Sequence, residues 1–170
     1  MCYNYRHRVC VAFKDRKEVI DMEKAFKFRI YPNKTQQVLL QKTFGCTRYI
    51  YNYFLAKRIE LYKQDKSSMS YNQCSKELTV LKQKLTWLKE PDKDSLQKSL
   101  KDLDVAYKNF FARPEAGFPK FKSKHDRHKS YRTSYTNGNI KFLVKKIQLP
   151  KLGKVKIKDK RTHLEGRILN

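Results

Sequence analysis

The chain has 170 residues, enough for one ordinary domain or two small ones, and carries a net charge of +24 with a pI near 10.0. Its aromatic share of 13% excludes a disordered basic tail, and repulsion among the positive charges favours a polyanionic partner. The apolar runs are too short for a signal peptide or a membrane span, so we expect a cytoplasmic protein with no membrane role.

The chain begins with a segment, 1–22, that shows no clear periodicity and that we expect to be an N-terminal extension. The next segment, 23–32, alternates aromatic or apolar residues with basic ones, which is the two-residue period of a half-buried strand. Pro32 ends this strand, and Asn33 is placed to cap a helix together with Gln36.

A helical domain is predicted for residues 33–114. Its first helix should run over about 34–44 and end at Gly45, and its second should run over about 46–64 with apolar residues on more than one face. Two later helices each carry one apolar stripe at spacings of three and four. The stripes are Cys74, Leu78, Leu81, Leu85 and Leu88, and then Leu96, Leu100, Leu103, Tyr107 and Phe110.

Residues 115–170 return to a two-residue period and are strongly basic. Strands are predicted at 131–136 and 140–144, joined by a type I′ turn at Asn137-Gly138, and then around Ile147 and Val155. The strand at 23–32 has no sheet of its own, so we expect it to join these later strands. The predicted fold class is therefore α+β, a helical bundle inserted after the first strand of a small, basic, partial β-barrel.

The motif GFPKFKSK begins at Gly117, where the bundle gives way to the sheet. Pro119 prevents a helix, and the lysines at every second position can share one side of an extended segment that follows a phosphate backbone. They are Lys120, Lys122 and Lys124. The alternative is a solvated surface with two buried aromatic residues.

Groups that could carry catalysis are missing from the sequence. The cysteines form no CxxC pair, the five glycines are scattered, and the acidic residues near the last helix are interpreted as helix-end groups or ion-pair partners. The prediction is binding without chemistry, with no catalytic residue, no metal ligand and no small-molecule substrate.

The chain resembles the TnpB family, also called OrfB, which bacterial insertion sequences encode. The resemblance covers about Glu23–Asn170 and rests on motifs in the expected order. They are KFRIYPNKTQQVLLQKTFGCTRYIYNYFLAKR, SYNQCSKELTVLKQ, WLKEPDKDSLQKSLKDLDVAYKNFF, GFPKFKSK, SYRTSYTNGNI and QLPKLGKVKIK. Members were long described as transposases with a helix-turn-helix, and they are RNA-guided DNA endonucleases similar to the ancestors of type V CRISPR effectors.

This resemblance implies a wedge-like β-barrel that holds a guide RNA and a helical recognition lobe that reads double-stranded DNA beside the target. The implied DNA-reading residues are Tyr71, Ser75, Lys93, Gln97 and Thr136, whose hydroxyl, amide and ammonium groups can address base edges or phosphates. The nucleic-acid backbone is assigned to Lys120, Lys122, Lys124, Arg132, Lys154 and Lys156. At Asp94 the chain departs from the family, where a relative has an aromatic residue.

Structural alternatives stay open for three of these positions. Tyr71 could pack against the start of its helix, Gln97 could complete a cap with Asp94, and Thr136 could be an ordinary strand residue.

The family's catalytic half is a RuvC-like nuclease that uses divalent metal ions and contains a zinc ribbon, and the sequence contains neither part. We therefore expect no cofactor in this chain and no DNA cleavage by it alone, with guide RNA and double-stranded DNA as partners in the bacterial cytoplasm or nucleoid. Two alternatives remain: a stand-alone helix-turn-helix regulator, and an enzyme completed by a separately encoded nuclease half.

Overall fold

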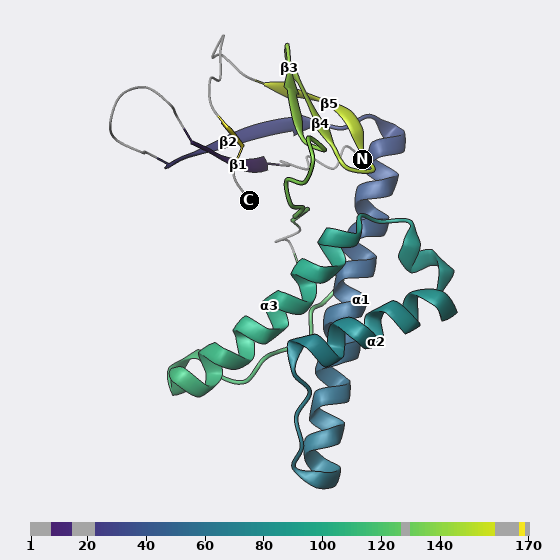
Figure 1. Ribbon diagram of the computed structural model, residues 1–170, viewed down its shortest axis with the longest axis vertical. Helices are drawn as coiled ribbons and strands as arrows, with labels where there is room; N and C mark the ends of the chain where they lie inside the picture. Colours follow the sequence, from purple (N-terminus) through teal and green to yellow (C-terminus); the bar gives the residue numbers. More distant parts are fainter. Residues whose placement is uncertain (1–7, 15–22, 127–129, 159–166, 169–170) are drawn as a thin grey trace. The chain divides into compact units, whose positions relative to one another are not determined.

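The computed structural model describes residues 8–14, 23–126, 130–158 and 167–168 (Figure 1). They form two compact units: a sheet unit, made of the described residues up to Leu39 and from Ser134 onward, and a helical unit, Leu40–Thr133. Strands and helices are segregated along the chain, which confirms the α+β class. None of the described helices has an apolar stretch sufficient to cross a bilayer.

The sheet unit contains one open antiparallel sheet with the strand order β3-β4-β5-β2-β1-β6 (Figure 1). The strands are β1 Arg8–Lys14, β2 Glu23–Tyr31, β3 Lys141–Leu143, β4 Lys146–Leu149, β5 Gly153–Lys158 and β6 Arg167–Ile168. Strand β2, which precedes the helices, pairs with β5, which follows them, and Ile30 lies opposite Ile157. The prediction that the helices interrupt one sheet is therefore confirmed.

The two faces of the sheet differ in polarity because its strands alternate apolar and basic residues. Side chains on one face are buried, and they are Ile30, Ile147, Leu149, Val155 and Ile157. The lysines between them on β5 are Lys154, Lys156 and Lys158, and all three are exposed. The apolar face thus supplies the core of this unit and leaves the basic face to solvent.

Strand β1 lies inside the segment 1–22, which was predicted to be an N-terminal extension. All seven of its residues pair with β2, from Arg8 opposite Arg29 to Lys14 opposite Glu23. This strand was not predicted from the sequence. Its alternation, with Val9, Val11 and Phe13 at every second position, is too short to identify without the partner strand.

The Asn137-Gly138 turn is confirmed, but the strand before it is not. Both turn residues have the positive φ that a type I′ turn requires, 48° and 73°, and the Asn139 N–H donates to the Thr136 carbonyl at 3.1 Å. Residues 131–136 form no strand, because side chains bind their backbone instead. The Asn139 amide, for example, donates to the Ser134 carbonyl at 2.9 Å.

Helix α1, Lys34–Asp65, begins as predicted. The Gln36 N–H donates to Asn33 Oδ1 at 2.8 Å, and the Asn33 N–H donates to Gln36 Oε1 at 3.0 Å. The Gln36 amide nitrogen also donates to the carbonyls of Leu152 and Lys154, at 2.9 and 3.0 Å, so the cap is tied to the start of β5.

The predicted end of the first helix at Gly45 is wrong, because α1 continues through this residue without a break. A glycine that ends a helix adopts positive φ, and Gly45 does not. A mid-helix glycine costs about 1 kcal/mol relative to alanine. Its neighbours Phe44 and Cys46 are both buried, and this packing offsets that cost.

The helical unit packs α1 against α2, Tyr71–Lys84, and α3, Lys93–Ala112, with short 3-10 turns at Thr86–Lys89 (η1) and Pro114–Ala116 (η2). The third predicted helix therefore ends before Leu88, which is buried from η1. Residues from α1, α2, η1 and α3 build one core, and they include Ile50, Phe54, Leu55, Cys74, Leu78, Leu88, Leu96, Leu100 and Leu103. Cys46 and Cys74 are free thiols within it, and burial raises the pKa of Cys46 to about 11.

Replacing Leu100 with alanine should destabilise the helical unit by about 2–5 kcal/mol, because this side chain is 1% exposed and its removal leaves a cavity. Denaturant unfolding followed by circular dichroism measures the change. The matched control is Val105→Ala on the same helix, where the side chain is 51% exposed and the loss should stay near or below 0.5 kcal/mol. Equal losses in the two variants would contradict the assigned core face of α3.

Candidate nucleic-acid interface

Three of the residues predicted to read DNA lie together in the helical unit, and we call them the polar triad: Tyr71, Ser75 and Gln97. The Tyr71 hydroxyl donates to Gln97 Oε1 at 2.9 Å, and the Gln97 amide nitrogen donates to Ser75 Oγ at 3.0 Å. All three side chains are half-buried. Burial, together with the negative charge of Asp104, raises the pKa of Tyr71, so its hydroxyl remains a donor at neutral pH.

The hydrogen bonds of the polar triad still leave groups that can address a base edge. The Gln97 amide nitrogen carries a second hydrogen after it has donated to Ser75, and the Tyr71 oxygen keeps its lone pairs. Lys93 is exposed at the first position of α3, one turn before Gln97 and on the same face. One turn further on, the Lys101 ammonium lies 5.9 Å from the centre of the Tyr71 ring. A basic residue therefore lies on each side of Gln97 along α3, and the spacing of four could have identified Lys101 from the sequence.

The alternative in which Gln97 completes a cap with Asp94 is wrong. Helix α3 begins at Lys93, so its N-cap is Asp92, and the Asp92 carboxylate makes no capping hydrogen bond. Instead it accepts a hydrogen bond from the Thr133 hydroxyl at 2.6 Å. Asp94 lies in the first turn, where the positive end of the helix dipole favours a carboxylate.

The segment around Arg132 is fastened to α3 by polar contacts. The Ser95 hydroxyl donates to the Arg132 carbonyl at 2.6 Å, and the Arg132 guanidinium forms an ion pair with Asp102. Burial and the charge of Asp92 raise the pKa of the neighbouring Tyr131. Arg132 is exposed, but a phosphate would have to compete with Asp102 for its guanidinium.

The three lysines of GFPKFKSK have different surroundings. Lys122 is held by Asn52, which accepts its N–H at 2.8 Å and donates to its carbonyl at 3.0 Å. Its ammonium lies 4.2 Å from the centre of the Tyr51 ring, and burial lowers the pKa of Lys122. All three lysines are exposed overall, and only Lys122 has these contacts to Asn52 and Tyr51. The contact between Asn52 and Lys122 was not predicted from the sequence. It joins residues 70 positions apart, so no local sequence pattern indicates it.

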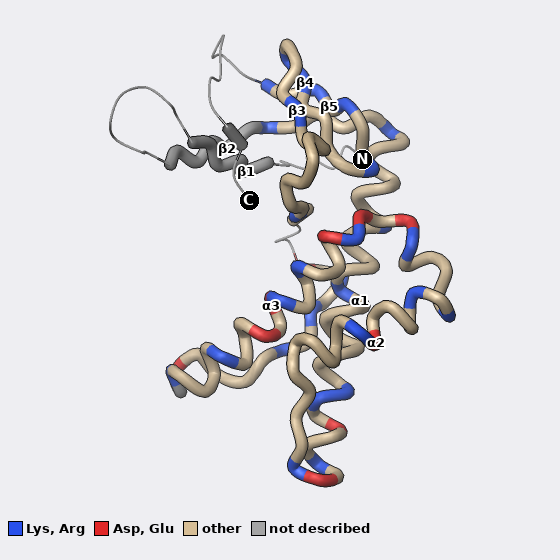
Figure 2. Tube along the Cα trace, in the orientation of Figure 1, with Lys and Arg blue, Asp and Glu red and all other residues tan. Residues whose placement is uncertain are grey.

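On the sheet unit, basic side chains lie directly opposite one another. Lys146 faces Lys156 across β4 and β5, and Arg29 faces Lys158 across β2 and β5. Like charges in such pairs destabilise a sheet, and the sequence has no acidic residue between Lys141 and Lys158 to offset them (Figure 2). This arrangement favours an anionic ligand on the exposed face.

A groove of about 650 Å³ lies at one end of this basic face. Its lining contains four lysines, one aromatic ring and two aliphatic residues: Lys145, Lys146, Lys156, Lys158, Tyr31, Val144 and Ile157. Tyr31 is 42% exposed, and the guanidinium of Arg29 lies 5.5 Å from the centre of its ring. The groove is open and cationic, which suits a flexible phosphate backbone better than a small neutral ligand.

Thr136 belongs to the sheet unit and starts the Asn137-Gly138 turn. It is exposed, and its N–H donates to Asn139 Oδ1 at 2.8 Å. It lies outside any strand, so the alternative of an ordinary strand residue is wrong.

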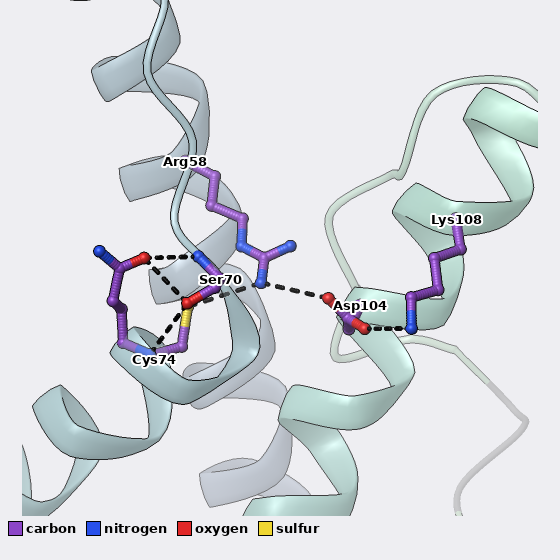
Figure 3. Close-up of polar contacts among 6 residues, drawn as sticks. Arg58, Ser70, Cys74, Asp104 and Lys108 are labelled. Carbon is purple, nitrogen blue, oxygen red and sulfur yellow. Dashed lines mark hydrogen bonds and ion pairs between the residues drawn. The ribbon is translucent and has the colours of Figure 1, made fainter.

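Arg58 is a buried charge that sequence reasoning missed (Figure 3). It is 7% exposed, its guanidinium donates to Cys74 Sγ at 3.6 Å, and it lies 3.7 Å from Asp104. Asp104 also pairs with Lys108 at 3.1 Å, so one carboxylate serves two cations. A signal was available, because Arg58 follows the buried Ile50 and Phe54 at a spacing of four. Arg58, on α1, therefore contacts Cys74 of α2 and Asp104 of α3. Its role is to hold the three helices together.

Across the described ranges 8–14, 23–126, 130–158 and 167–168, no three His, Cys, Asp or Glu residues lie close enough together to hold a metal ion.

Comparison with known proteins connects these features to one family. The family model HTH_OrfB_IS605, described as a helix-turn-helix domain, matches residues 22–67. In the structure these residues include β2 and the single continuous helix α1, and no turn interrupts that helix.

Two similar proteins are much longer than this chain. The chain is 37% identical over 105 residues to a "Putative RNA-guided DNA endonuclease" of Streptomyces pristinaespiralis, an alignment that covers 61% of the chain and 26% of that protein. It is 34% identical over 140 residues to a "Putative RNA-guided DNA endonuclease InsQ" of Escherichia coli K12, covering 81% of the chain and 34% of that protein. The chain thus spans about a quarter to a third of the length of these relatives.

A third relative has a length close to that of the matched region. The chain is 33% identical over 116 residues to "Virulence protein VsdF" of Salmonella dublin, and the alignment covers 62% of the chain and 98% of that protein. With the motif order, the matching family model and the two endonuclease alignments together, the chain belongs to the TnpB/OrfB family.

Proposed function

We propose that this chain is a nucleic-acid-binding part of a TnpB-type RNA-guided DNA endonuclease, and that it grips RNA and DNA without cutting them. The observation that carries the proposal is the set of like-charged pairs on the exposed face of the sheet, Lys146 with Lys156 and Arg29 with Lys158. Such pairs oppose folding in the free protein, and a polyanion converts them into favourable contacts.

The sheet unit is proposed to hold a structured guide RNA as part of a wedge-like barrel. The groove lined by Tyr31 and Lys156 offers ammonium groups for phosphates and an aromatic ring beside them. Binding through phosphates releases counterions, so affinity should fall steeply with salt. The names of the Streptomyces and Escherichia coli relatives, which describe RNA-guided enzymes, support an RNA ligand.

The helical unit is proposed to read the DNA duplex beside the target through the polar triad. Amide groups such as that of Gln97 make paired hydrogen bonds to adenine in the major groove, and Lys93 and Lys101 lie where they can meet phosphates. The guide would read the remaining sequence by base pairing.

No step of phosphodiester cleavage is assigned to this chain. Such cleavage in this family needs acidic residues that hold two metal ions, and we propose that those residues belong to a RuvC-like part beyond the matched motifs. The regulator alternative gains no support from α1, because a continuous helix offers no separate recognition helix between residues 34 and 65.

Replacing Lys146 and Lys156 together with glutamine should weaken RNA binding and make it less sensitive to salt. Each lost phosphate contact should reduce the slope of log K against log salt concentration by about one. Filter binding to a structured RNA across a salt series measures the slope. Lys63→Gln, an exposed lysine in the last turn of α1, is the matched control and should leave the slope unchanged.

The same double substitution should not lower the stability of the free protein, because it removes a pair of opposed like charges. If the slope stays at its original value in the double variant, the basic face of the sheet is not the RNA site.

Replacing Gln97 with alanine should relax the sequence preference for duplex DNA, at a cost of about 1–3 kcal/mol in binding the preferred duplex. Selection from a randomised duplex pool, followed by competition binding, measures both effects. RNA affinity serves as the internal control and should not change. A variant with lower thermal stability but an unaltered sequence preference would show that the polar triad only joins α2 to α3.

A further inference from the structure

A group of aromatic rings, two of them exposed, lies at the C-terminal end of α3 and in the segment after it. We call it the aromatic platform, and it consists of Tyr107, Phe110, Phe111 and Phe118. The Tyr107 and Phe111 rings stack with centres 6.4 Å apart. Phe118 stands edge-on to Tyr107 at 5.7 Å and to Phe110 at 5.4 Å. Phe111 is nevertheless 77% exposed and Phe118 46% exposed, although aromatic rings of this size are normally buried.

The platform is fixed in place at its inner end. The buried guanidinium of Arg58 lies 5.1 Å from the centre of the Tyr107 ring, so the first ring of the platform rests on the core. Gly117 adopts a φ of 68°, which favours glycine, and this turn precedes Phe118. In Figure 1 the C-terminal end of α3 lies apart from α1 and α2. The outer rings are therefore held in a defined position while they remain accessible.

Basic residues flank the platform along the chain. Between positions 108 and 124 the chain has one acidic residue, Glu115, and five basic ones: Lys108, Arg113, Lys120, Lys122 and Lys124. Arg113 and Lys120 are exposed. A second copy of the chain is a poor occupant, because each copy carries a net charge of +24 and the copies repel one another. The surrounding charge instead complements an anionic ligand with flat apolar groups.

We propose that the aromatic platform binds single-stranded nucleic acid, with unpaired bases stacked on Phe111 and Phe118 and phosphates beside Arg113 and Lys120. Stacking on an aromatic ring needs no particular base, so this site should be tolerant of sequence, unlike the polar triad. A duplex keeps its bases paired and stacked and cannot use the platform. The inference rests on the proposed binding of polynucleotides, but it adds a separate site with a different preference.

Fluorescence anisotropy with labelled oligo(dT), oligo(rU) and a short DNA duplex tests the platform on the full chain. Phe111→Ala should weaken binding of the single strands about tenfold or more and leave duplex affinity unchanged. Phe111→Trp should restore the affinity, since it provides a larger ring. Val105→Ala, an exposed apolar residue on the same helix, is the matched control and should have no effect. Loss for only one of the two oligonucleotides would identify the strand as DNA or RNA.

Three results would overturn the proposal. The first is unchanged single-strand affinity in Phe111→Ala and in Phe118→Ala. The second is wild-type protein that binds the duplex and a structured RNA but neither oligonucleotide. The third is a self-association of the wild type, detected by light scattering, that Phe111→Ala abolishes while oligonucleotide binding persists, because the platform would then serve a second copy. Wild-type protein that binds none of the nucleic acids would instead refute the proposed function itself.

Discussion

The pairing of β2 with β5 is the constraint on which the rest of the structure depends. Ile30 lies opposite Ile157, so the sheet can close only after the whole helical segment has been made. Closing so long a loop has an entropic cost that grows slowly with length, and the buried apolar face of β4, β5 and β2 offsets it. The residues between these strands form a separate unit, Leu40–Thr133, whose core is built from its own side chains.

The two units treat their charged and polar groups differently. In the helical unit the groups are largely satisfied internally: the polar triad bonds within itself, Arg58 meets Asp104, and Arg132 meets Asp102. On the sheet, lysines and arginines face one another across the strands. The first arrangement suits selective recognition, because a ligand must match fixed groups. The second suits strong but unselective attraction to phosphate.

Sequence patterns predicted those features of the fold that depend on neighbours in the chain. The alternation around Ile147 and Ile157, the cap at Asn33, the turn at Asn137-Gly138 and the stripe that includes Leu100 all have local causes. Failures occurred where distant contacts decide the outcome. Helix α1 continues through Gly45 because the residues on either side of it are packed in the core. The Arg132 carbonyl accepts a hydrogen bond from the Ser95 hydroxyl. The two-residue period that predicted a strand at 131–136 contains no sign of this distant contact.

The residues of the candidate site could be predicted from the sequence, but some of the contacts that hold them in place could not. Resemblance to the family selected Tyr71, Ser75 and Gln97, and the structure brings these three together. The resemblance could not indicate that Arg58 is buried against the Tyr107 ring of the aromatic platform. Charged residues in a predicted helix are ordinarily assigned to its solvent-exposed face.

Gln36 makes the beginning of α1 dependent on the sheet. Its one amide group accepts from the Asn33 N–H and donates to the carbonyls of Leu152 and Lys154. A shift of α1 by a single residue would move this amide about a quarter-turn around the helix axis and break all three bonds together. These bonds fix the position of α1 relative to the turn that leads into β5. The residue at which the helical insertion starts is therefore determined by a segment more than a hundred positions later in the chain.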